Sequence, residues 1–417
     1  MSRAIIIVVD RLGSGFLGPY GNTWVDTPAI NRFASQSILW EHFLSDSPLL
    51  SSVYHSYWSG KHAFQVQAQP TVPTTCLPQQ LTAADIPTVL ISDDQEILDH
   101  PAAGGFADSI LIPTEVPDTT VDSIEETQMA NVLAEALQWL EPVPADSSFL
   151  AWIHVRGMEG PWDAPQMLRE WFHDEEDPEL PTWTTPPQQQ QIDAFDPDQL
   201  LGITQAYAGQ ISGLDSCLGA FWQAVEELPA GQQTLCALTS PRGFPLGQHG
   251  RIGTCDHPLF GELLQVPCML RLPADALAAQ RVHSLVQPHN FYGTLLNWFE
   301  QTDLLATERV TPTPLMPVNP SQPNRLNWPA SNHRAVAVGP AQRALRTPAW
   351  FLHQPTTNPP QLYVKPDDRW ETNDVANRCP DIVEQMIAQL DLCQQLFEQT
   401  ANVTWPTLPK LLAEGLD

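Results

Sequence analysis

Strand-like apolar runs alternate with amphipathic helical segments along most of the chain. The longest apolar runs are continuous, as in strands that are buried on both faces of a sheet. These runs are 4–10 (AIIIVVD), 86–92, 148–155 (SFLAWIHV) and 233–240 (QTLCALTS), with a shorter one near residue 110. The helical patterns cover 26–37, 123–140 and 200–228. The alternation predicts an α/β fold with a large mixed, mostly parallel sheet that is flanked by helices.

Proline-rich stretches divide the chain into parts. The 41 prolines indicate long irregular connections, and two stretches are too rich in proline for regular structure. We expect 180–199 to be a loop inserted in a large α/β domain of residues 1–309, and 310–333 to be a connection between that domain and the rest of the chain. The remainder, 334–417, has three strand-like segments and one helical segment. It predicts a small C-terminal α+β subdomain with an antiparallel sheet and a helix.

The charge of the chain narrows the range of partners. With 48 acidic and 19 basic residues the formal net charge is −29, which repels nucleic acid and anionic membrane surfaces. Such a field also disfavours sulfate and phosphate esters unless a local basic pocket overrides it. We therefore expect no nucleic-acid or membrane partner; the partner is unknown, with a small anion or another protein left as the possible classes.

The cysteines and the first residues bear on location. Seven scattered cysteines, with no C-x-x-C pair, lie partly in apolar runs, and buried reduced thiols explain them best. The chain enters a strand-like run at once, without a signal peptide, and has no apolar segment long enough to span a membrane. We expect a cytoplasmic protein.

Eight segments, in order along nearly the whole chain, resemble one known family. They include IIIVVDRLGSGFLGPYGN, SPLLSSVYHSYWSGKHA, FLAWIHVRGMEGPWDAP, LTSPRGFPLGQHG and QLYVKPDDRWETNDVAN. Together they resemble the sulfatase family of the alkaline-phosphatase superfamily. The resemblance implies a sulfuric ester hydrolase with a formylglycine nucleophile, made from Cys or Ser in a C-x-P-S-R context, and a bound divalent cation.

The positions that match the family's nucleophile segment have other residues here. Leu50 stands at the nucleophile position and Tyr54 at that of the signature arginine. Leucine has no heteroatom to convert, and a phenol cannot supply the cation. If the alignment is shifted by one or two residues, Ser51 or Ser52 is the fallback nucleophile, which would need a base or a metal to activate it.

The cation positions are changed as well. The resemblance implies an acidic pair after the first strand and an Asp-Asn or Asp-His pair after a later strand; here these are Asp10-Arg11 and Pro241-Arg242. Because one carboxylate meets two permanent guanidinium charges, the four positions together carry about +1. Asp10 is the only surviving ligand type, so we expect no metal or other cofactor. Calcium or magnesium is expected only if an active hydrolase has rebuilt the site.

The other matched positions complete an inverted charge pattern. Asp93 stands for a lysine and Gln95 for a histidine, Glu159 stands for a histidine, and Thr254 is the nearest match to a later lysine. His249 is the main polar survivor besides Asp10. We interpret the whole set as a vestigial pocket.

Three structural questions stay open at this level. Arg11 and Arg242 either fill the former cation site and pair with Asp10 or Glu159, or point to solvent. A second question is whether other residues form a different metal site. The third is whether an aromatic cluster plugs the pocket or stacks on carbohydrate. The residues of that metal site would be Asp93, Asp94, Glu159 and His249, and those of the aromatic cluster are Tyr54, His55, Tyr57 and Trp58.

Three functions follow from these observations. The leading hypothesis is a sulfatase-like pseudoenzyme that has lost hydrolysis and is kept for binding or assembly. The second is a sulfuric or phosphoric ester hydrolase with a rebuilt active site. The third is a non-catalytic binder of anions or sulfated glycans that uses Arg11 and Arg242.

Overall fold

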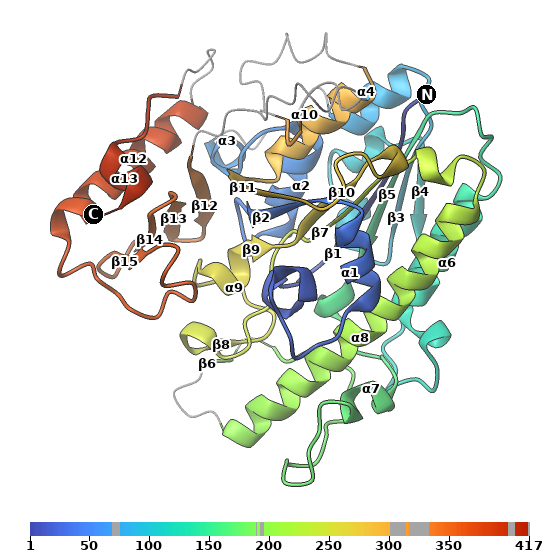
Figure 1. Ribbon diagram of the computed structural model, residues 1–417, viewed down its shortest axis with the longest axis horizontal. Helices are drawn as coiled ribbons and strands as arrows, with labels where there is room; N and C mark the ends of the chain where they lie inside the picture. The colour runs from blue at the N-terminus through green and yellow to red at the C-terminus, as the bar shows by residue number, and fades with distance from the viewer. Residues whose placement is uncertain are drawn as a thin grey trace.

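The computed structural model describes residues 1–68, 76–188, 190–191, 196–300, 314–316, 333–398 and 405–415. A nine-stranded sheet with helices on both faces forms the larger part, and a separate four-stranded antiparallel sheet lies beside it at the C-terminal end (Figure 1). This arrangement confirms the predicted fold class.

The large sheet is mixed and mostly parallel. Its strand order is β11-β2-β10-β7-β1-β5-β3-β4, and β9 pairs with β2. β1 runs parallel to both β5 and β7, whereas β10 is antiparallel to its two neighbours, β7 and β2. The strands are β1 Arg3–Val9, β2 Ile38–Leu44, β3 Thr88–Ser92, β4 Asp108–Leu111, β5 Phe149–Val155, β7 Leu235–Thr239, β9 Gln265–Val266, β10 Cys268–Arg271 and β11 Gln280–Val286.

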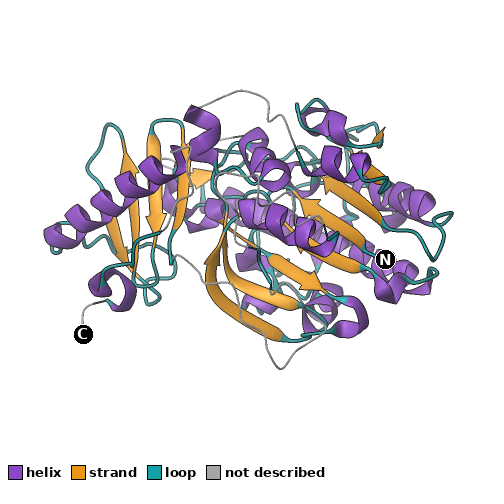
Figure 2. Cartoon of the chain, turned by 90° about the horizontal axis from the view of Figure 1, so that it is seen from above, coloured by secondary structure: helices purple, strands orange, loops and turns teal. Residues whose placement is uncertain are grey.

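Alternate side chains of the central strand β1 fill two cores. Ile5, Ile7 and Val9 pack on the face covered by α1, α6 and α8. Ala4, Ile6 and Val8 pack on the face covered by α2, α4 and α10. Figure 2 shows helices on both sides of this sheet. The helices of this part are α1 Pro28–Ser35, α2 Leu50–Ser59, α3 Ala63–Ala68, α4 Leu77–Ala83, α5 Gln95–Leu98, α6 Gln128–Leu140, α7 Gln166–Glu170, α8 Pro197–Glu227, α9 Gly261–Leu264 and α10 His289–Trp298.

The C-terminal unit has a core on each face of its sheet. One face packs against α12, α13 and the start of α3. The other face packs Phe351 and Tyr363 against Phe260 and Leu263 of the segment around α9, so the two units share a hydrophobic interface. The elements are β12 Ala335–Gly339, β13 Gln342–Arg346, β14 Trp350–Pro355, β15 Gln361–Val364, α12 Pro380–Glu398 and α13 Lys410–Glu414.

The two proline-rich segments lie partly outside the described residues. Of the predicted connection 310–333, only 314–316 and 333 are described. Within the predicted loop 180–199, β6 (Gln190–Gln191) pairs with β8 (Arg251–Ile252), while 189 and 192–195 are outside the description.

Two general features of the described residues bear on function. No described helix combines the length and the apolar character that crossing a membrane requires. All seven cysteines are free thiols, and six of them are buried.

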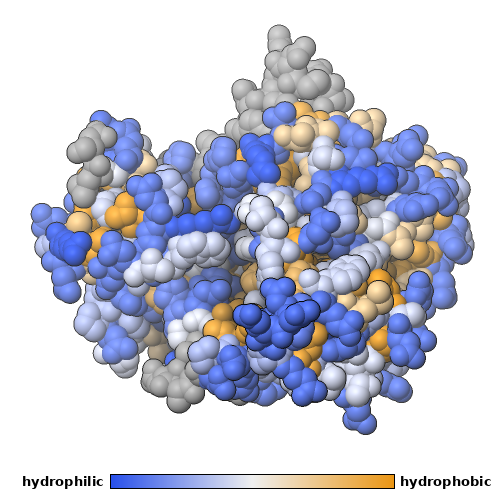
Figure 3. All heavy atoms as spheres, turned by 60° about the horizontal axis from the view of Figure 1, so that its bottom comes forward, coloured by the Kyte–Doolittle hydropathy of each residue, from blue (hydrophilic) through white to orange (hydrophobic). Residues whose placement is uncertain are grey.

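The face in Figure 3 is mainly hydrophilic, with the hydrophobic residues in small groups.

Candidate functional site

The candidate site lies where four parallel strands end. β1, β3, β5 and β7 run in the same direction in adjacent positions, so their carboxyl ends meet at one edge of the sheet. Asp10 follows β1, Asp93 follows β3, and the turn that carries Glu159 follows β5. Arg242 comes three residues after β7. The fold therefore gathers most of the residues that the sequence singled out.

A buried ion pair joins the ends of β1 and β7. Asp10 is fully buried, and both of its carboxylate oxygens accept hydrogen bonds from Arg242, from Nε at 3.0 Å and from Nη2 at 2.9 Å. This bidentate geometry is the strongest that an arginine and a carboxylate form. The remaining nitrogen, Nη1, donates to the Pro48 carbonyl and to Asp256, each at 3.2 Å. Arg242 thus connects the strand ends to the loop that precedes Leu50.

Arg11 extends this pair into a network. Its Nε donates to Glu159, its Nη1 to the Cys255 carbonyl at 3.0 Å and its Nη2 to Asp256 at 3.3 Å. The backbone of Arg11 is left-handed, with φ of 58°, and its carbonyl accepts a hydrogen bond of 2.9 Å from Tyr207. A non-glycine residue adopts this conformation only when its surroundings hold it there.

Gly157 explains how Glu159 reaches the site. It has φ of +52°, and a Cβ at this position would lie 2.4 Å from Val9 Cγ1. Only glycine therefore fits the turn after β5 without displacing β1. The next residue, Met158, donates its N–H to the Asp10 carbonyl at 3.0 Å, which holds the turn against the end of β1.

We call the five charged residues of this network the ion cluster. Its members are Asp10, Arg11, Glu159, Arg242 and Asp256. The four matched positions sum to +1 as expected, and the carboxylates of Glu159 and Asp256 bring the formal charge of the whole cluster to −1. The arginine side chains are buried, at 3% and 9% exposure, and they pair with acids instead of pointing to solvent.

The electrostatics of the central pair follow from burial and charge together. Burial opposes ionisation of Asp10, but the charge and hydrogen bonds of Arg242 outweigh it and hold the pKa of Asp10 below its usual value. Burial likewise opposes the charge of Arg242, and the Asp10 carboxylate overcomes this and raises the pKa of Arg242. Both groups are charged at neutral pH, and each is neutralised by the other.

The residues present do not fit the divalent cation that the resemblance implies. Calcium takes six to eight oxygen ligands, and magnesium demands near-ideal octahedral geometry. Both Asp10 oxygens already accept hydrogen bonds from Arg242, and the guanidinium carries a fixed positive charge beside them. The Arg242 charge would repel a dication at this place, and Asp10 has no free carboxylate oxygen to bind it.

The nucleophile position is part of the hydrophobic core. Leu50 is the first residue of α2 and is 3% exposed, in the same core cluster as Tyr54. Ser51 and Ser52, the fallback residues, are half-buried on α2. The apolar contacts of Leu50 account for its position without a chemical role.

Tyr54 forms a buried pair that the sequence did not indicate. Its hydroxyl lies 2.6 Å from Nδ1 of His154 on β5, and both residues are fully buried. Burial raises the pKa of Tyr54 well above its usual value and lowers the pKa of His154, although the Asp10 and Asp94 charges oppose the shift of His154. The two groups are therefore neutral, and they supply neither the cation of the signature arginine nor an exposed base.

The remaining matched residues have separate partners. Asp93 is buried and accepts from the Arg156 N–H at 2.8 Å, and burial raises its pKa to about 7. Gln95 is exposed and donates to Asp99.

The other two matched residues lie between β7 and α9, one on each side of β8. His249 stacks on Phe260 with ring centroids 3.7 Å apart and hydrogen-bonds to Glu262. Thr254 donates its N–H to the Pro187 carbonyl. In the parts of the chain that are described, these contacts place Gln95, His249 and Thr254 outside the ion cluster.

The two alternative groupings are not assembled as binding sites. Asp94 caps α5 by accepting the Glu96 N–H at 2.9 Å, so the proposed second metal set is divided among different partners. Tyr54, Tyr57 and Trp58 are fully buried and pack on Trp152, so these three rings offer no face to carbohydrate, and the half-buried His55 packs against His100. A different group has spacing suited to a metal ion among the described residues. It consists of Glu41, His42 and His283.

Sequence reasoning missed Asp256 and His154. Asp256 lies two residues after Thr254 and contacts both arginines, and this proximity in the chain was the one available signal. His154 is the single polar residue inside the apolar run of β5, and that interruption marked it as a buried hydrogen-bonding group.

Comparisons with known proteins agree with this fold. The sulfatase family model matches residues 2–301. Human arylsulfatase D is 33% identical over 61 residues, which is 15% of this chain and 10% of that protein.

Solved structures resemble the chain over almost its whole length. The phosphonate monoester hydrolase of Agrobacterium radiobacter has a TM-score of 0.73 at 15% identity and covers 96% of both chains. A protein solved with its substrate D-glucosamine-2-N,6-O-disulfate has a TM-score of 0.75 at 13% identity, with 95% of this chain and 98% of that one covered. A 2-O GAG sulfatase has a TM-score of 0.71 at 16% identity, with 95% and 93% covered. At these identities the likeness establishes the fold alone.

Proposed function

Because the chain belongs to the sulfatase family, we propose that it is a pseudoenzyme of that family, which does not hydrolyse esters and keeps the scaffold for binding or assembly. One observation carries the proposal. The bidentate Asp10–Arg242 pair occupies the strand ends where the family resemblance implies a divalent cation. A fixed internal cation replaces an exchangeable one, and it brings no Lewis acidity and no activated water.

The nucleophile position supports the same conclusion. Leu50 provides no atom that could attack an ester, and its side chain is buried in the core. The position of the signature arginine holds Tyr54, whose hydroxyl is bonded to His154 rather than directed at a ligand. Cation, nucleophile and anchoring arginine are thus all replaced.

Anion binding at the ion cluster has less support. An anion would have to displace three carboxylates from Arg11 and Arg242. Because the formal charge there is −1, we propose that the scaffold binds elsewhere on its surface.

Two general properties complete the proposal. The seven free thiols support a location in the cytoplasm, because its reducing environment keeps cysteines from forming disulfides. The net charge of −29 supports a partner other than nucleic acid or an anionic membrane.

Turnover measurements test the proposal directly. The purified chain is assayed with an aryl sulfate, an aryl phosphate and a phosphonate monoester, with and without Ca²⁺ or Mg²⁺. We expect no turnover above the uncatalysed rate from the unaltered chain or from Asp10→Asn under any of these conditions. Turnover by the unaltered chain that Asp10→Asn abolishes, with the fold retained by circular dichroism, would establish a rebuilt hydrolase and overturn the proposal.

A further inference from the structure

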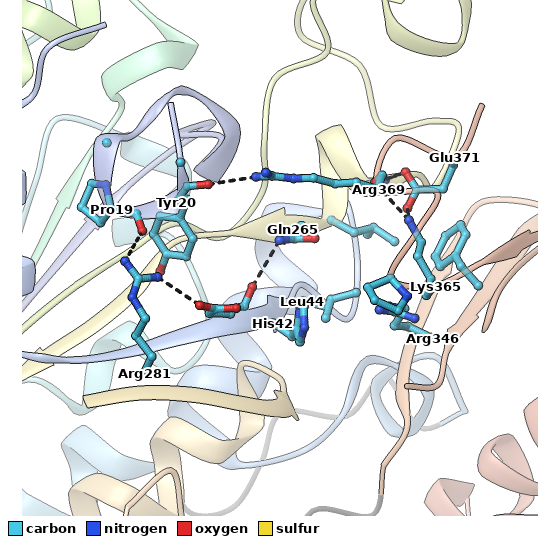
Figure 4. Close-up of a pocket in the computed structure, with 17 residues that line it drawn as sticks. Pro19, Tyr20, His42, Leu44, Gln265, Arg281, Arg346, Lys365, Arg369 and Glu371 are labelled. Carbon is cyan, nitrogen blue, oxygen red and sulfur yellow. Dashed lines mark hydrogen bonds and ion pairs between the residues drawn. The ribbon is translucent and has the colours of Figure 1, made fainter. Parts of the chain in front are cut away.

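A cavity of about 380 Å³ lies between the two sheets. One wall comes from the turn 18–21, from β2 and from β11, and the other comes from the C-terminal unit, with α9 between them (Figure 4). No member of the ion cluster lines it. The volume is within the range of small-molecule sites and suits a compact organic molecule of monosaccharide size.

The cavity gathers positive charge in a strongly acidic chain. Four of the 19 basic residues line it, against two carboxylates, Glu41 and Glu371. The basic residues are Arg281, Arg346, Lys365 and Arg369. His42 also lines it, and burial together with the Arg346 charge lowers the pKa of this histidine to about 4, so that it is neutral. The lining therefore carries an excess of two positive charges.

Two of the four cations have acidic partners, and two are held by neutral oxygens. Lys365 pairs with Glu371, and Arg281 pairs with Glu41 at 3.0 Å. Arg369 donates to the Tyr20 carbonyl at 3.0 Å, and Arg346 donates through Nη1 to carbonyls that include Pro348 at 3.2 Å.

Carbonyl oxygens orient a guanidinium without cancelling its charge. The excess charge thus belongs to Arg346 and Arg369, which approach the cavity from the C-terminal unit, as Figure 4 shows.

Burial makes the charges of Arg346 and Lys365 costly. Arg346 is 7% exposed, and burial lowers its pKa to about 10 even though the Glu371 charge opposes the shift. Burial also lowers the pKa of Lys365 despite its pairing with Glu371. An anion that enters the cavity restores to these groups the interactions that water no longer supplies.

We propose that this cavity binds a phosphate monoester of about monosaccharide size. A phosphate monoester carries close to two negative charges at neutral pH and so balances the lining, whereas a sulfate monoester carries one. Phe351, Leu44 and Pro366 provide an apolar surface for the organic part. The proposal concerns a site apart from the ion cluster, and it does not depend on whether the chain hydrolyses esters.

A metal ion is the competing occupant of the same region. The ligand atoms of Glu41, His42 and His283 lie within 4.8 Å of one another. However, Arg281 pairs with Glu41 at 3.0 Å, and a dication would add to an excess of positive charge. The geometry therefore favours an anion.

Calorimetric titration of the full chain at pH 7.5 and 0.15 M salt tests the proposal. The probes are glucose 6-phosphate, glucose 6-sulfate and Zn²⁺. We expect glucose 6-phosphate to bind with one site per chain and at least 10-fold more tightly than glucose 6-sulfate. The double variant Arg281→Gln/Arg369→Gln should weaken the binding at least 10-fold, and both positions are exposed enough to keep the fold.

The matched control is Arg32→Gln. Arg32 is also an exposed arginine in a 3.0 Å ion pair, with Glu226, but it lies outside the cavity. This variant should bind glucose 6-phosphate as the unaltered chain does. The absence of glucose 6-phosphate binding, equal loss in the control and the double variant, or Zn²⁺ binding that His283→Ala abolishes while the phosphate does not bind would each overturn the proposal.

Discussion

At the scale of single residues, the centre of the ion cluster is the buried pair of Asp10 and Arg242. Arg242 supplies a positive charge that cannot dissociate, and this charge together with its hydrogen bonds holds the pKa of Asp10 below its usual value although burial opposes ionisation. The pair is buried, so its two members depend on each other far more than the members of a surface pair do.

Removing one member of this pair should lower the free energy of unfolding more than replacing both members does. Arg242→Met leaves the fully buried Asp10 carboxylate without its partner, and we expect the free energy of unfolding to fall by about 3–5 kcal/mol. The double variant Asp10→Leu/Arg242→Met removes both charges, so its free energy of unfolding should fall by less than that of Arg242→Met alone. Urea unfolding measures both differences, with Arg32→Gln as the surface control, which should stay within about 1 kcal/mol. Losses that simply add in the double variant would contradict the coupling.

Residue identity alone could not predict this network. The family resemblance placed Asp10, Arg11 and Arg242 near one another, and they meet because the residues after parallel strands lie at one edge of the sheet. It could not choose between paired and solvent-facing arginines, because that choice depends on the turn at Gly157 and on Asp256, which joins from a loop.

At the scale of elements, the positions of strands were more predictable than their directions. Continuous apolar runs marked β1, β5 and β7. β2 was missed because Glu41 and His42 interrupt its apolar run near the sheet edge, and the antiparallel direction of β10 leaves no mark on the periodicity of its sequence. The helix predicted from residue 123 begins at Gln128, because the Thr127 side chain accepts the Ala130 N–H and caps it there.

Asp46 joins three elements and makes their packing depend on pH. Its Oδ2 accepts from Ser56 of α2 and from the Ala63 N–H at the start of α3, and its carbonyl accepts from Val338 of β12. Its Oδ1 is buried without a hydrogen-bond partner in the described structure. Burial raises the pKa of Asp46 to about 7, so the folded state holds this proton more tightly than the unfolded state does.

The stability of Asp46→Asn should therefore differ from that of the unaltered chain in a pH-dependent way. A raised pKa contributes stability that is complete below about pH 4 and is lost as pH rises to about 7. Asparagine does not titrate. Between pH 5 and pH 8 we therefore expect the free energy of unfolding of the variant to rise by on the order of 2–4 kcal/mol relative to that of the unaltered chain. Denaturant unfolding across that range measures the gain, with the exposed Asp118→Asn as the control. A difference that does not change with pH would show that Asp46 is ionised throughout.

At the scale of the whole molecule, the chain has the sheets of the sulfatase fold, and the ion cluster lies where its parallel strands end. The family model spans residues 2–301, and the structural likeness covers more than 90% of the chain. Basic residues are scarce, yet two groups of them gather at defined places in the fold. Arg11 and Arg242 are balanced by acids, whereas the cavity between the sheets keeps an excess of positive charge. The distribution of charge thus distinguishes the ion cluster, whose arginines are paired with acids, from the cavity, where basic residues outnumber acidic ones.

The central claim is that the Arg242 guanidinium has taken the place of a divalent cation. Calorimetric titration of the metal-stripped chain with Ca²⁺ and Mg²⁺ at 0.15 M salt tests it, in parallel with Asp10→Asn. We expect no saturable binding that distinguishes the two proteins. Binding of one ion per chain that Asp10→Asn abolishes would mean that the carboxylate still holds a metal, and it would contradict the account.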